Sequence, residues 1–137
     1  MKNLANYKIS VRTREYLIQA IYQMIFDNQG SSVIISQFKN EHKAKKVDFK
    51  MFSQSLKSIE KNKIKIDAVI DSLDIKKSSI QIIDKSILYF AINEILYGSL
   101  DQPITIDESI RLSKKFSSPD SFKFINASLD KFIKKLR

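Results

Sequence analysis

Residues 84–96 read "DKSILYFAINEIL" and lie within the most apolar stretch of the chain, residues 80–97. Apolar side chains recur here every three or four residues, which places them on one face of an α-helix. Gly98 follows directly, and glycine is a common residue at the end of a helix. A helix this apolar is buried among other elements, so the stretch predicts the central helix of an all-α fold. The side chains that share the predicted face are Ile83, Ile87, Phe90, Ala91 and Ile95.

Helical spacing precedes this central stretch. Residues 11–28 form one long pattern that is apolar around most of its circumference, which predicts a largely buried helix. Residues 32–42 are ambiguous between a strand and a helix, and the helical patterns around them favour a short helix. A further pattern runs over residues 48–73 and is either continuous or broken within "KNKIKID", residues 61–67.

Two more helices are predicted after the central stretch. Thr105 and Glu108 have the spacing of a capping box, which predicts a helix start. Ser118 and Pro119 predict the start of the last helix, because serine suits the N-cap and proline the first turn. We therefore expect an all-α, single-domain bundle of about six or seven helices over residues 1–137.

The composition excludes several classes of protein. Only two glycines and two prolines occur among 137 residues, which favours helices over a sheet with many turns. The chain has no cysteine, and its one histidine is His42. No Gly-rich phosphate loop is present. We therefore expect a protein that is not an enzyme and that holds neither metal nor cofactor.

The chain also lacks the features of a membrane or secreted protein. No apolar run reaches the roughly 18 residues of a membrane span. The N-terminal residues lack the apolar core of a secretory signal. We expect a cytoplasmic protein that makes no membrane contact.

Charge is unevenly distributed along the chain, whose net charge is +9. Residues 1–14 carry four basic residues and no acidic one, and residues 111–137 carry eight basic residues against two acidic ones. Residues 86–110 contain no lysine or arginine and four acidic residues. The basic ends suggest a polyanionic partner, usually nucleic acid.

The last predicted helix carries an aromatic side chain outside its apolar repeat. At about 100° per residue, Phe124 falls opposite the repeat and close to Lys123 and Lys131. Lysines that contact phosphates and aromatic rings that stack on bases are typical of surfaces that bind single-stranded nucleic acid. We therefore expect Phe124 to stack on a base, with phosphates contacted by Lys114, Lys123 and Lys131. The apolar repeat comprises Phe122, Ile125, Leu129, Phe132, Ile133 and Leu136.

Two polar residues interrupt apolar faces and are expected to have structural roles. Glu94 lies within the central apolar helix, so we expect it to be buried and hydrogen-bonded. Asn126 lies between Phe122 and Leu129 at helical spacing. It is either a buried amide that bridges helices, which we favour, or a polar group shared with a ligand site.

Three stretches of the chain resemble the NusB family of bacterial transcription antitermination factors. They are "RTREYLIQAIYQ" (12–23), "DKSILYFAINEIL" (84–96) and "ITIDESIRLSKKFSSPDSFKFINASLDK" (104–131), in the order in which the family has them. The resemblance implies a seven-helix bundle without catalytic activity. It also implies that the protein pairs with NusE, a protein of the small ribosomal subunit. The pair would bind boxA-type single-stranded RNA in nascent ribosomal RNA, within an RNA polymerase antitermination complex.

Matching positions in these motifs give the RNA-binding residues that the resemblance implies. They are Arg12, Arg14, Lys114, Phe116, Asp120, Ser121, Lys123 and Phe124. NusE-type proteins are basic by the same resemblance, so we expect the partner to dock on the lysine-free stretch. Its expected contacts are Tyr97, Asp101 and Asp107.

Three alternatives remain open from the sequence. The same fold occurs at the front of an RNA cytosine methyltransferase, from which the chain could be a fragment. A basic adaptor that binds only proteins is a second alternative. A helix-turn-helix DNA-binding protein is the weakest, because no helix shows several exposed base-reading side chains.

Overall fold

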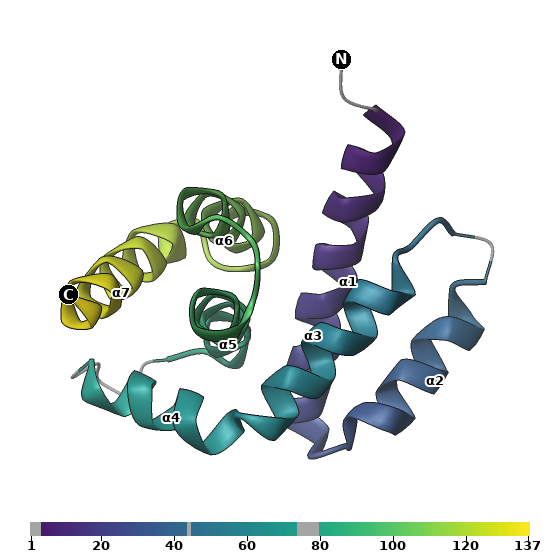
Figure 1. Cartoon of the computed structure of the whole chain (residues 1–137), viewed down its shortest axis with the longest axis horizontal. Coiled ribbons are helices and arrows are strands. Elements are labelled where there is room, and N and C mark those ends of the chain that lie inside the picture. Colours follow the sequence, from purple (N-terminus) through teal and green to yellow (C-terminus); the bar gives the residue numbers. More distant parts are fainter. Residues whose placement is uncertain (1–3, 44, 74–79) are drawn as a thin grey trace.

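The structure is a computed structural model that describes residues 4–43, 45–73 and 80–137. Seven α-helices occupy these residues, and no strand occurs among them (Figure 1). The all-α fold and the expected number of helices are therefore confirmed. The helices are α1 (Leu4–Asp27), α2 (Ser31–Glu41), α3 (Phe49–Lys61), α4 (Lys63–Ser72), α5 (Ile82–Tyr97), α6 (Gln102–Phe116) and α7 (Ser121–Leu136).

Helix α5 is the centre of the fold, as its sequence predicts. It packs against α1 and α3 on one side and against α6 and α7 on the other (Figure 1). Every residue from Ser86 to Asn93 is buried. The predicted single apolar face is therefore too narrow, because neighbouring helices cover α5 almost completely in this region.

Two helix boundaries in the first half of the chain are set by polar contacts. The carboxylate of Glu60, near the end of α3, accepts hydrogen bonds from both the backbone N–H and the hydroxyl of Ser31, each at 2.7 Å. This contact satisfies one of the free N–H groups at the start of α2. The long pattern over residues 48–73 breaks at Asn62, whose side chain donates to the Ser58 carbonyl at 2.8 Å.

Two helix starts in the second half differ from the sequence prediction. Helix α6 begins at Gln102, before the predicted capping box, with Asp101 at its N-cap position and a proline in its first turn. Thr105 lies inside the helix and is buried, and its hydroxyl donates to the Asp101 carbonyl at 3.1 Å. Helix α7 begins at Ser121, because residues 118–120 form a turn that the Ser121 N–H closes on the Ser118 carbonyl at 3.0 Å.

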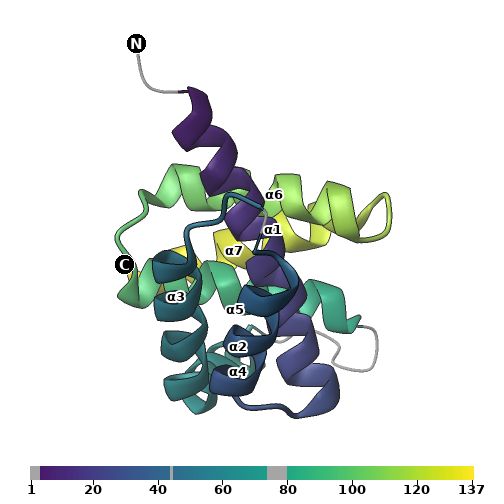
Figure 2. The same ribbon diagram turned by 90° about the vertical axis from the view of Figure 1, so that its right-hand side faces the viewer.

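Helices α6 and α7 pack against each other along one side of α5, and the turn between them projects at an edge of the molecule (Figure 2). None of the described helices is both long and apolar enough to cross a membrane.

Candidate nucleic-acid interface

A buried carboxylate fixes the turn between α6 and α7. Asp84, in the first turn of α5, is only 5% exposed. Its carboxylate accepts hydrogen bonds from the hydroxyls of Ser117 at 2.6 Å and Ser121 at 3.4 Å. These two serines lie on either side of the turn, so Asp84 ties both ends of it to α5.

Phe122 lies immediately after this turn and is surrounded by lysines. The Nζ atom of Lys114 lies 4.7 Å from the centre of the Phe122 ring, and that of Lys123 lies 6.0 Å from it. The ring is half-buried and does not belong to the apolar core. A shallow groove between α6 and α7 runs past these three side chains to Asn126. This arrangement places two cations and an aromatic face on one surface.

Phe124 has a different environment from the predicted one. It is half-buried and packs against the apolar core, so the prediction that it faces away from the core is wrong. Ser128, one turn further along α7, is also buried, which shows that the buried face is wider on this side than the apolar repeat indicates. Phe122 and Phe124 therefore flank this face on α7, and Phe122 is the ring that contacts the lysines.

Two other predicted residues of α7 are placed differently from expectation. Lys131 donates to the backbone carbonyl of Leu73 at 2.8 Å and thereby caps the end of α4. Its ammonium group is therefore used in a structural contact. Asn126 is exposed at the α6–α7 groove, so the favoured interpretation as a buried amide is wrong.

Arg14 is part of an ion-pair network that joins α1 to α6. Its guanidinium lies 2.8 Å from the Glu108 carboxylate, and Arg111 lies 2.6 Å from both Glu108 and Glu15. Lys115 completes the network at 2.9 Å from Glu15. Arg14 therefore contributes to helix packing, whereas the resemblance implied that it contacts RNA.

The network holds both of its carboxylates in the ionised form. Burial by itself would raise the pKa of Glu108, but hydrogen bonds and charge from Arg111 and Arg14 outweigh it, so the pKa is below its usual value. The pKa of Glu15 is likewise lowered, because Lys115 and Arg111 outweigh the effect of burial. Burial would lower the pKa of Arg111, but its two carboxylate partners raise it.

The remaining predicted RNA-binding residues have varied surroundings. Arg12 donates to the Lys46 carbonyl at 2.9 Å, in the connection between α2 and α3. Phe116 is half-buried against the core. Asp120 is exposed and pairs with Lys123 at 3.7 Å, so both residues lie at the surface beside Phe122. The structure thus groups Lys114, Asp120, Ser121 and Lys123 with Phe122 around the α6–α7 turn.

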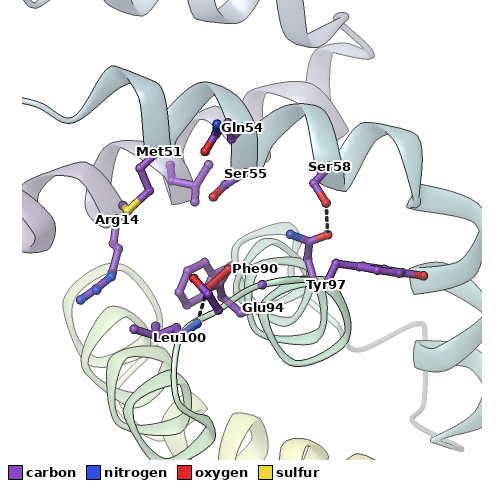
Figure 3. A pocket seen from close by; sticks show the side chains of 13 residues that line it. Arg14, Met51, Gln54, Ser55, Ser58, Phe90, Glu94, Tyr97 and Leu100 are labelled. Carbon is purple, nitrogen blue, oxygen red and sulfur yellow. Dashed lines mark hydrogen bonds between the residues drawn. The ribbon is translucent and has the colours of Figure 1, made fainter.

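The predicted partner surface borders a pocket of about 420 Å³ between α1, α3 and α5 (Figure 3). Glu94 lines this pocket and accepts a hydrogen bond from the Leu100 N–H at 3.3 Å. The expected hydrogen bond is present, but Glu94 is only half-buried, so full burial is not observed.

The residues predicted to contact the partner all lie at the surface. Tyr97 lies at the rim of the pocket and is 42% exposed. Asp101 and Asp107 are both exposed.

Two contributors to this surface were missed by sequence reasoning. The sequence pattern placed Phe122 in the apolar repeat. The available signal was its two lysine neighbours, since Lys123 is the next residue and packing of two consecutive helices can bring Lys114 close to the ring. Asp84 opens the central apolar helix, and a carboxylate at that position is a signal for a polar contact. Its serine partners lie more than 30 residues away, so only the tertiary fold identifies them.

The fold and this surface define a class: an all-α protein that presents lysines and an aromatic ring on a helix pair. No group of side chains suited to a metal ion occurs in residues 4–43, 45–73 and 80–137. A family model described as the NusB family matches residues 11–134. The chain therefore belongs to the NusB family.

Individual relatives agree with this assignment. The chain is 34% identical over 127 residues to a protein of Tolumonas auensis named transcription antitermination protein NusB, with 91% of this chain and 92% of the relative covered. A Clostridium perfringens protein of the same name is 36% identical over 133 residues, with coverage of 93% and 98%. The fold also matches a chain in the crystal structure of antitermination factors NusB and NusE in complex with dsRNA. That match has a TM-score of 0.83 at 15% identity and covers 93% of this chain and 98% of the other.

Proposed function

We propose that this protein is a transcription antitermination factor. It binds boxA-type single-stranded RNA in nascent ribosomal RNA transcripts and acts with NusE in an RNA polymerase antitermination complex. The similarity to proteins named transcription antitermination protein NusB, over more than nine-tenths of the chain, carries this proposal. In this role the protein is cytoplasmic and performs no catalysis.

The α6–α7 surface provides the proposed RNA contacts. A base stacks on the Phe122 ring, and Lys114 and Lys123 contact the neighbouring phosphates. Stacking tolerates any base, whereas hydrogen-bonding groups such as Asn126 and Asp120, which lie beside the ring, discriminate between bases. Asp84 supports the surface from below by fixing the turn that presents these side chains.

NusE docks, in this proposal, on the surface that includes Tyr97, Asp101 and Asp107. These residues are exposed, and the chain from residue 86 to 110 contains no lysine or arginine. A basic partner is attracted to such a surface, which speeds and orients the encounter. RNA and partner then occupy different parts of the protein, so both can be bound together.

A titration of labelled boxA-type RNA tests this function directly. We expect the protein alone to bind the RNA, and added NusE to increase the affinity, because the pair forms the RNA-binding unit. An RNA of the same composition in scrambled order is the control. Equal affinity for both RNAs, with and without NusE, would contradict the proposed function.

A further inference from the structure

A second basic surface lies at the connection between α2 and α3, across α1 from the α6–α7 helix pair (Figure 1). We define the connection lysines as the five lysines in residues 39–50, all of which are exposed. No part of the proposed function uses them. They are Lys39, Lys43, Lys45, Lys46 and Lys50.

Residues 39–50 hold only two acidic residues against the five lysines, so the segment keeps a net positive charge. Asp48 accepts a hydrogen bond from the Met51 N–H at 3.0 Å and caps α3. Glu41 accepts one from the Gln37 amide at 3.0 Å. Within the described part of the chain, no connection lysine forms an ion pair with a carboxylate. The cluster is therefore a concentration of unpaired positive charge.

Contacts with α1 hold the connection in place. Arg12 donates to the Lys46 carbonyl at 2.9 Å, and the Asp48 N–H donates to the Thr13 hydroxyl at 3.0 Å. The His42 ring stacks on Tyr16, with ring centres 4.3 Å apart. These contacts fix the backbone that carries the lysines, although like charges held close together repel each other. A bound polyanion would remove this repulsion.

We propose that the connection lysines bind the phosphates of RNA that extends beyond the segment held by α6 and α7. Because it takes RNA as the polyanion, this inference rests on the proposed function. No exposed aromatic ring lies among these lysines, so the surface suits sequence-independent phosphate contact and not base stacking. Lys8, one turn before Arg12 on α1, is also exposed.

Two RNAs of different length test the inference. The short RNA contains only the boxA-type element, and the long RNA contains the same element with unstructured flanks on both sides. The variant is Lys43→Ala with Lys46→Ala. The matched control is Lys57→Ala with Lys61→Ala, which removes the same charge from two exposed lysines of α3. Affinity is measured for each protein and RNA over a range of salt concentrations.

Each phosphate contact to a single strand contributes about 0.7 to the slope of log K against log salt. We expect the variant to bind the long RNA with a slope reduced by about 1.4 and the short RNA with an unchanged slope. The control should match the wild type with both RNAs. Thermal melting should show that both proteins are folded, since all four lysines are exposed.

The possible failures are distinguishable. If the variant and the control behave alike on the long RNA while the short RNA is still bound, the inference is wrong and the proposed function stands. If the variant lowers the affinity for both RNAs equally, the connection lysines contact the boxA-type element itself. The inference that they bind only the flanking RNA is then contradicted. If the wild type binds neither RNA, both the inference and the proposed function are contradicted.

Discussion

Phe122 and Phe124 lie two residues apart on α7, yet they have different surroundings. Phe124 packs against the core, whereas Phe122 lies beneath the ammonium groups of Lys114 and Lys123. Consecutive helical residues are separated by about 100°, so residues two apart face different sides of a helix. Phe124 therefore contributes to core packing, whereas Phe122 forms part of the α6–α7 surface.

Replacing Phe122 should weaken RNA binding without unfolding the protein. Stacking of a base on an aromatic ring contributes about 1–3 kcal/mol, so Phe122→Ala should lower RNA affinity roughly 5- to 150-fold. Fluorescence anisotropy with labelled RNA measures this change, and thermal melting measures the fold. An unchanged affinity would show that no base stacks on this ring.

Phe124→Ala is the matched comparison. Because Phe124 packs against the core, this substitution should lower the melting temperature more than Phe122→Ala does. The same RNA titration tests the contact that the family resemblance implies for Phe124. Equal melting temperatures for the two variants would contradict the packing described here.

Asp84 should stabilise the turn between α6 and α7. Asp84→Ala leaves the hydroxyls of Ser117 and Ser121 without their acceptor, which should cost on the order of 1–3 kcal/mol of folding free energy. Asp84→Asn keeps one carbonyl acceptor and should cost less. Denaturant unfolding measures both variants. If the alanine variant is as stable as the wild type, Asp84 does not fix the α6–α7 turn.

Among the helices, the central position of α5 was predictable, because a helix that is apolar over nearly its whole length must be buried among the others. The boundaries of α3, α4, α6 and α7 depend on other contacts. Asn62 ends α3 by bonding back to Ser58, and the predicted capping residue Glu108 is instead paired with two arginines. The Asn62 contact is local but depends on a side chain that fits either a continuous or a broken helix, and Arg14 lies 94 residues from Glu108, so helical periodicity alone reveals neither contact. Likewise, the lysines of the site were predictable, but the ring beside them was not.

The network between α1 and α6 makes stability depend on pH. Glu15 and Glu108 have pKa values below the usual value of 4.5, so their ionised forms are favoured in the folded protein. Their contribution to stability is complete above pH 4.5 and is lost as the pH falls through the lowered pKa values. Glu108→Gln should therefore destabilise the protein at neutral pH and make the loss of stability below pH 4.5 shallower.

Thermal melting of Glu108→Gln across this pH range measures the effect. Asp107→Asn is the control, because Asp107 is exposed and makes no ion pair with any described residue. Identical pH profiles for Glu108→Gln and the wild type would show that the network does not stabilise the joint between α1 and α6.

At the scale of the whole molecule, charge separates the proposed binding surfaces. The chain has a net charge of +9, yet residues 86–110 contain only acidic charge. Basic residues therefore concentrate at α6–α7 and at the α2–α3 connection, and the proposed NusE surface lies on a segment without them. This distribution allows RNA and a basic partner to bind without competing for one surface.

Charge reversal on the acidic segment should affect only the partner. The double substitution Asp101→Lys and Asp107→Lys should weaken association with NusE, because it replaces attraction by repulsion, and should leave RNA affinity unchanged. The control carries Asp27→Lys and Glu41→Lys, two exposed acidic residues on α1 and α2. Calorimetry at low and high salt compares the affinities of the variant and the control for NusE. Unchanged association at both salt concentrations would place the partner elsewhere.

The salt dependence of binding is the sharpest test of the proposal that boxA-type RNA binds at the lysines and aromatic ring of α6–α7. The measurement compares the wild type with Lys114→Ala and Lys123→Ala combined, using a short boxA-type RNA. We predict a negative slope of log K against log salt for the wild type, and a slope reduced by about 1.4 in the variant, since two phosphate contacts are lost. Identical slopes for the two proteins would show that these lysines do not contact the RNA.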